Sequence, residues 1–198
     1  MVNLVDIRSV SFDTSFVLKP SITIDNVIKI LFKDDIKCFI TSTVISELEQ
    51  LKIWNRISSY EYHMAIKRWK KTKAKIIDFK NRFLSSQFSR ECLISMKKHH
   101  GVKQQDINND CNILITTLKN GVDLFLSEDF HFTSKITREV IKDVTSNACT
   151  EFHQMCDSEL YSVNAETFLE AYKDGKIDID VIKNNMKSIR KPGKILFF

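Results

Sequence analysis

Four acidic residues have types and positions that suit metal chemistry: Asp13, Glu47, Asp110 and Asp129. Two of them follow apolar runs, and the other two lie near the starts of helical segments. Carboxylates held close together repel one another unless a divalent cation neutralises them. Oxygen ligands without histidine or cysteine partners suit Mg²⁺ or Mn²⁺. Such a site can activate water and stabilise the charge that develops during phosphodiester cleavage.

Each acid also has a structural interpretation. Asp110 could be a helix N-cap, Asp129 a turn former, and Glu47 a solvated helix residue favoured by the helix dipole. Asp13, which ends the apolar run "SVSF", could be a polar stop without function. The placement of all four relative to strands and helices therefore matters more than any one of them.

Short apolar runs alternate with helical patterns along most of the chain. We predict strands at "VSF", "KCFIT", "VDLFLS" and "LYSV". We predict helices in the segments that begin at Ser21, at Ser42 or Thr43 as N-cap, near Asp110, near residue 134 and at Asn164. This alternation predicts a central, mostly parallel sheet in a three-layer α/β/α sandwich.

In such sheets the functional crevice lies outside the carboxyl ends of the strands. We therefore expect the four acids to converge at one edge of the sheet. A dinucleotide-binding site is excluded, because "FDTSFVLKP" after the first strand has no glycine.

The segment from about 55 to 100 differs in character and is predicted to be a helical insertion. Its period predicts helix from residue 58 to 87, with Ile76, Ile77 and Phe83 buried, and a further helix around residues 88 to 98 that ends at Gly101. Residues 1–172 are predicted to form a single domain, and residues 173–198 a C-terminal tail.

A basic stretch within this segment is a candidate surface for phosphates. The candidate nucleic-acid-binding residues are Lys67, Arg68, Lys70, Lys71 and Lys73. Tyr60, Tyr62 and Trp69 could stack on bases, although core packing is the simpler interpretation of these aromatic side chains.

The composition is that of a globular protein. The 198 residues carry a formal net charge of +5, which is compatible with a polyanionic partner. The five cysteines form no CxxC pair, so a reduced, cytoplasmic chain is expected. We expect no signal peptide, and no run approaches the roughly 18 apolar residues of a membrane span.

The ordered set of acidic segments resembles the PIN-domain nuclease family, which includes VapC-like toxins and archaeal-type PIN ribonucleases. The segments are "FDTSFVL", "ITSTVISELEQL", "NNDCNILITTLKNG" and "LFLSEDFHF", and "YSVNAETFLEAY" resembles the family's terminal strand and helix. The resemblance implies a Mg²⁺- or Mn²⁺-dependent endoribonuclease that hydrolyses single-stranded RNA.

The resemblance also implies roles for individual residues. Asp13, Glu47 and Asp110 would be metal ligands, directly or through water, and Asp129 would complete a second metal position. The hydroxyl of Thr14 or Ser15 would orient Asp13, and Ser127 occupies the hydroxyl position of the last motif. Asp106 is a reserve for the third acid and Glu128 for the fourth.

Other functions remain open from the sequence. The same fold could cut DNA or structured nucleic acid, or could be a catalytically silent module that binds RNA or protein. By resemblance to toxin members, the partners could include a small antitoxin-type protein and a second copy of the chain.

Overall fold

A five-stranded parallel sheet forms the centre of the computed structural model, which describes residues 3–100 and 107–186. The strands lie side by side in the order β4 (Lys75–Ile77), β3 (Lys37–Thr41), β2 (Ser9–Phe12), β5 (Leu124–Leu126) and β6 (Tyr161–Val163). Phe12 pairs with Ile40 and with Leu126, so the carboxyl ends of the three central strands lie level with one another. The predicted parallel sheet is confirmed.

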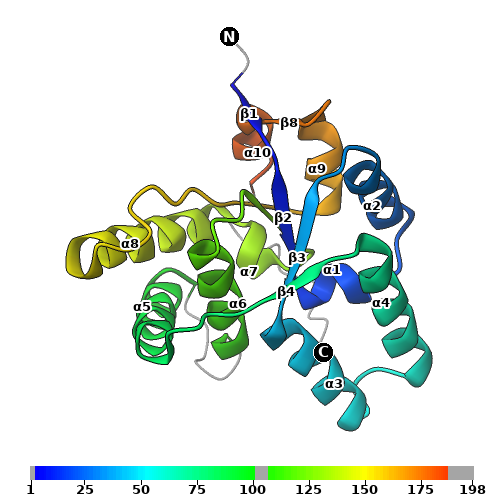
Figure 1. Cartoon of the computed structure of the whole chain (residues 1–198), viewed down its shortest axis with the longest axis horizontal. Coiled ribbons are helices and arrows are strands. Elements are labelled where there is room, and N and C mark those ends of the chain that lie inside the picture. Colours follow the sequence, from blue (N-terminus) through cyan, green and yellow to red (C-terminus); the bar gives the residue numbers. More distant parts are fainter. Residues whose placement is uncertain (1–2, 101–106, 187–198) are drawn as a thin grey trace.

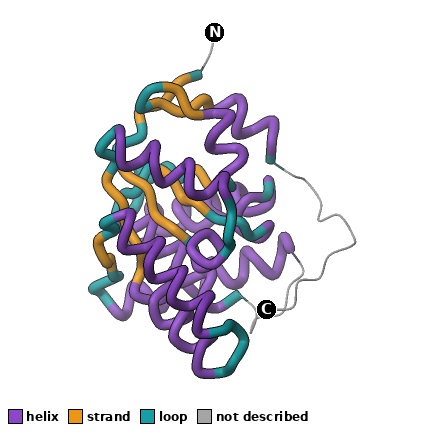
Figure 2. Tube along the Cα trace, turned by 90° about the vertical axis from the view of Figure 1, so that its right-hand side faces the viewer, coloured by secondary structure: helices purple, strands orange, loops and turns teal. Residues whose placement is uncertain are grey.

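Helices lie on both sides of this sheet, as Figure 1 shows and Figure 2 shows from a second direction. On one side lie α5 (Arg82–His100), α6 (Asn108–Lys119) and α8 (Lys135–Phe152). On the other lie α2 (Ile22–Lys33), α4 (Ser59–Thr72) and α9 (Ala165–Ala171). Because both faces are covered, all four residues of β2 are buried, and Ser11 is accommodated through a hydrogen bond from Thr117.

Three helices begin directly beyond the carboxyl ends of the central strands. They are α1 (Thr14–Leu18), α3 (Ser42–Ile53) and α7 (Phe130–Thr133). The N-cap of α3 is Thr41, not Ser42 or Thr43 as predicted, because the helix begins immediately after the strand. The Thr41 hydroxyl accepts a hydrogen bond from the Val44 backbone N–H at 3.3 Å.

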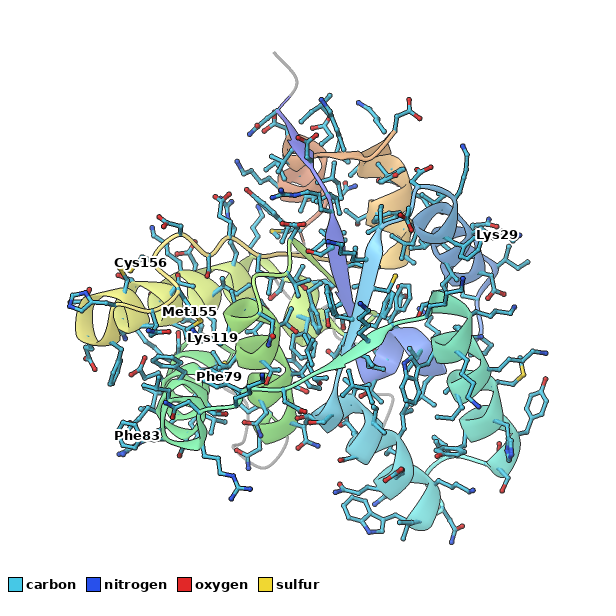
Figure 3. The ribbon with its side chains drawn as sticks, in the orientation of Figure 1. Lys29, Phe79, Phe83, Lys119, Met155 and Cys156 are labelled. Carbon is cyan, nitrogen blue, oxygen red and sulfur yellow. A yellow bond between two sulfur atoms is a disulfide. The ribbon has the colours of Figure 1, made fainter. Side chains whose placement is uncertain are left out.

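The segment from 58 to 87 is not helical throughout, contrary to the prediction. Lys73 ends α4 in the left-handed region, with φ of 52°, and β4 then adds an edge strand to the sheet. Ile76 is 53% exposed and Phe83 is 64% exposed, so neither is a core residue. Figure 3 shows Phe83 at the outer surface of α5, which begins at Arg82. Gly101 lies outside the described residues.

The two ends of the described chain meet in a second, antiparallel sheet. It has the order β1 (Leu4–Asp6), β8 (Lys176–Asp178) and β7 (Tyr172–Lys173), and α10 (Ile179–Asn185) follows. Ile177, Ile179 and Ile182 are completely buried. The first part of the predicted tail is therefore folded onto the domain, whereas residues 187–198 lie outside the described residues.

The cysteines differ from the expectation that all are reduced. Cys149 and Cys156 form a disulfide across the turn that follows α8, and Cys38, Cys92 and Cys111 are free and buried. Within the described residues, no helix is long and apolar enough to cross a membrane.

Candidate active site

Asp13 ends the central strand and caps the helix that follows it. Its backbone N–H donates to the Leu126 carbonyl at 3.0 Å, which continues the pairing of β2 with β5. Its side chain is buried, and Oδ2 accepts hydrogen bonds from the Ser15 N–H at 3.2 Å, the Ser15 hydroxyl at 2.6 Å and the Ser127 hydroxyl at 2.9 Å. Within the described part of the chain, Oδ1 makes no hydrogen bond and is available to a ligand.

The hydroxyls of Ser15 and Ser127 connect Asp13 to the end of β5. The Ser15 hydroxyl accepts from the Glu128 N–H at 2.9 Å, and the Ser127 hydroxyl accepts from the Asp129 N–H at 3.0 Å. Both predicted orienting serines therefore contact Asp13. Of the two alternatives Thr14 and Ser15, it is Ser15 that contacts Asp13, and the Thr14 hydroxyl instead donates to Oε2 of Glu47.

Glu47 and Asp129 come from the helices that follow the neighbouring strands. Glu47 lies in α3 and Asp129 is the N-cap of α7, where its Oδ1 accepts from the His131 N–H at 2.8 Å. Both side chains are half-buried. The strands that precede these helices, β3 and β5, flank β2 in the sheet, so the fold places both acids near Asp13.

Asp110 lies in the first turn of α6 and is half-buried. Burial raises its pKa well above the usual value, and the negative charges of Asp13, Asp129 and Glu47 raise it further. Burial likewise raises the pKa of Asp13 to about 6, against the hydrogen bonds from Ser15 and Ser127, and Glu47 and Asp129 add to the rise. The four acids therefore lie in one electrostatic neighbourhood.

The oxygen atoms of these four side chains are of the type that binds a hard divalent cation. All four groups are carboxylates, and crowded negative charges are relieved by a cation. Within residues 3–100 and 107–186, however, no group of three or more histidine, cysteine or acidic side chains is arranged closely enough to hold an ion. Because Mg²⁺ requires ligand oxygens about 2.0–2.1 Å away, the side chains would have to close around the ion.

The two reserve acids have different outcomes. Oε2 of Glu128 forms an ion pair with the Lys19 ammonium group at 2.7 Å, and Oε1 accepts a hydrogen bond from the Ala165 N–H at 2.9 Å. Glu128 therefore connects the end of α1 with the start of α9. This role could not be predicted from the sequence, because no motif relates Lys19 or Ala165 to Glu128. Asp106 lies outside the described residues.

The predicted basic surface is only partly exposed. Lys67, Lys70, Lys71 and Lys73 are exposed, but Arg68 is 6% exposed, which corrects its assignment to this surface. The Arg68 guanidinium donates to the Val17 carbonyl and lies 3.7 Å from Asp25. Arg68 faces inward because Ala65, three residues earlier, lies on the buried side of α4.

Two of the three candidate stacking residues pack inward. Tyr62 and Trp69 lie against the hydrophobic core, and the Trp69 indole donates to the Ala74 carbonyl at 3.3 Å. Tyr60 is 73% exposed. Core packing is thus confirmed for Tyr62 and Trp69 and wrong for Tyr60.

Comparison with protein-family models, with curated proteins and with solved structures finds no match to this chain. The class that its own structure defines is a mixed α/β protein with a five-stranded parallel sheet. Its candidate site is at the carboxyl edge of that sheet, where the charges of Glu47 and Asp129 act on both Asp13 and Asp110.

Proposed function

We propose that this chain is a PIN-like endoribonuclease that uses Mg²⁺ or Mn²⁺ to hydrolyse phosphodiester bonds of single-stranded RNA. One observation carries the proposal. In addition to burial, Glu47 and Asp129 raise the pKa of both Asp13 and Asp110, and the four acids come from separate elements at the edge where parallel sheets place their sites. The PIN-like three-layer architecture and a cytoplasmic location belong to the same proposal.

Asp13, Glu47, Asp110 and Asp129 would hold the metal. When bound, such an ion supplies a polarised water molecule and neutralises charge on the scissile phosphate. Ser15 and Ser127 fix Asp13 through Oδ2, which leaves Oδ1 for coordination. Burial and the negative charges of Asp13, Asp129 and Glu47 raise the pKa of Asp110, so a bound cation would favour its charged form.

Cleavage of a labelled single-stranded RNA, measured with Mg²⁺, with Mn²⁺ and with EDTA, tests the proposal. Asp13→Asn and Glu47→Gln should each lower the rate by about a hundredfold or more, because each removes an electrostatic group from the site. Glu49→Gln is the matched control, since Glu49 is an exposed acid on the same helix. Full activity in Asp13→Asn would refute the proposal.

A panel of single- and double-stranded RNA and DNA separates the remaining candidates. Preferential cleavage of DNA or of duplexes would assign a different nuclease activity to the same site. Binding of RNA without cleavage in either metal would indicate a silent binding module. Light scattering with and without a co-expressed small antitoxin-type protein tests the proposed partner and the proposed homodimer.

A further inference from the structure

The helices α3 and α4 form a hairpin whose tip is unusually apolar for an exposed turn. Figure 1 shows α3 running away from the end of β3 and α4 returning towards the sheet. Ile53 is 73% exposed, Trp54 is 65% exposed and Tyr60 is 73% exposed. We call these three residues and Arg56 the hairpin tip. Large aromatic side chains grouped at an exposed turn indicate a contact surface.

The position of Trp54 on α3 relates it to the acidic site. Trp54 follows Glu47 by seven residues, which is nearly two full turns of an α-helix, so the two residues lie on the same side of α3. Trp54 is the C-cap of α3 and still follows the helical spacing, because its N–H donates to the Gln50 carbonyl four residues earlier at 2.9 Å. The exposed indole is therefore displaced from Glu47 by about 10 Å along the helix.

The charges around the hairpin favour a polyanion. The exposed cations of this region are Lys52, Arg56, Lys67, Lys70, Lys71 and Lys73. The exposed acids on α3 and α4 are Glu49 and Glu61, and Glu61 is engaged in a capping box with Ser58 at 2.7 Å. A cationic surface with exposed aromatic rings is the combination that binds single-stranded nucleic acid.

We propose that Trp54, together with Tyr60, binds unpaired bases of the substrate strand by stacking and so directs the strand towards Glu47 and Asp13. The inference rests on the proposed ribonuclease function and deepens it, because it accounts for a single-stranded substrate. Bases in a duplex are already stacked on one another and cannot cover an indole face. Trp69 and Tyr62 take no part, since both pack against the core.

Binding of a fluorescent oligouridine to the full chain tests this role without cleavage. The measurement uses the Asp13→Asn background in EDTA. Trp54→Ala should weaken binding about tenfold, whereas Trp54→Phe keeps an aromatic face and should retain most of the affinity. The slope of affinity against salt should stay unchanged, because stacking neutralises no phosphate. Phe83→Ala, which removes another exposed ring, is the matched control.

A second readout reports directly on the indole. The chain contains two tryptophans, so a Trp69→Phe variant leaves Trp54 as the single tryptophan, which can be excited selectively over the tyrosines at long wavelength. Its fluorescence should be quenched by oligouridine, with a midpoint that matches the affinity from the first measurement. Quenching would not follow from a purely structural role of Trp54.

The outcomes separate this inference from the proposed function. Unchanged affinity in Trp54→Ala, while the wild type still cleaves RNA, would overturn the stacking role and leave the nuclease intact. Quenching and weakened binding, with no cleavage by the wild type, would support the stacking role and refute the nuclease. Absence of oligouridine binding, or equal weakening for duplex RNA, would overturn the inference.

Discussion

At the scale of single residues, the buried charge of Asp13 is unfavourable until a cation arrives. The residue is 4% exposed, and burial is the main cause that raises the pKa of its carboxyl group from 3.8 to about 6. A folded-state pKa above the unfolded value means that the folded state binds the proton more tightly. The stabilisation is therefore complete below pH 3.8 and is lost as the pH rises through about 6.

The corresponding prediction concerns the metal-free protein. In EDTA, the contribution of Asp13 to the free energy of unfolding should fall by about 3 kcal/mol as the pH rises through this window. Asp13→Asn should make the total fall smaller by this amount, because an amide oxygen does not titrate and can still accept from Ser15 and Ser127, whereas the loss that comes from Asp110 remains. Asp6→Asn, at a largely exposed carboxylate, is the control. Denaturant unfolding at a series of pH values measures the effect, and an identical profile in Asp13→Asn would contradict it.

Two buried serines, one just after β5 and one within β6, offer a second test. Ser127 is completely buried and its hydroxyl connects Asp13 with the Asp129 N–H. Ser127→Ala should cost about 1–3 kcal/mol of unfolding free energy, because it leaves buried polar groups unpaired. It should also weaken Mn²⁺ binding in calorimetry.

The matched control is Ser162→Ala. Ser162 is also buried, but its hydroxyl has no hydrogen-bond partner within the described residues. Its removal should leave stability and Mn²⁺ affinity near those of the wild type. Equal effects at both serines would show that the Ser127 hydroxyl has no special connection to Asp13.

At the scale of elements, strands with continuous apolar runs could be predicted from the sequence. The central strands β2, β3 and β5 are buried between helices, so their composition is distinctive. The strand β4 could not be predicted, because Lys75–Ile77 lies at an open edge and has the composition of the preceding helix. The positions of the four acids could be predicted from the positions of the strands. The hydrogen bonds of Thr14 and Glu128 could not, because they depend on tertiary packing.

Arg68 illustrates the same limit within a helix. Five neighbouring cations look alike in the sequence, and only the phase of α4 against α1 turns Arg68 inward. Arg68→Ala should lower the unfolding free energy by about 2 kcal/mol, because it leaves the Val17 carbonyl without its donor. Lys67→Ala, one residue earlier and exposed, should change it by less than about 0.5 kcal/mol. Thermal and denaturant unfolding of both variants check the difference.

At the scale of the whole molecule, the net charge is +5, and several of the exposed lysines lie on α4 or at its end. Reversal of Lys70, Lys71 and Lys73 to Glu should weaken RNA binding at low salt. It should also reduce the slope of log affinity against log salt by about two, because fewer phosphates are neutralised. Binding titrations over a range of salt concentrations measure both. Unchanged affinity at low salt would exclude this face of α4 from RNA binding.

The central claim is that four carboxylates from separate elements hold one metal centre. A crystal structure of the full chain soaked in Mn²⁺, with anomalous scattering to locate the ion, tests this claim most directly. We expect Mn²⁺ at the carboxyl edge of the sheet, coordinated by Asp13 Oδ1 and contacted directly or through water by Glu47, Asp110 and Asp129. Binding of Mn²⁺ elsewhere, or an acidic edge that stays empty at saturating Mn²⁺, would contradict it.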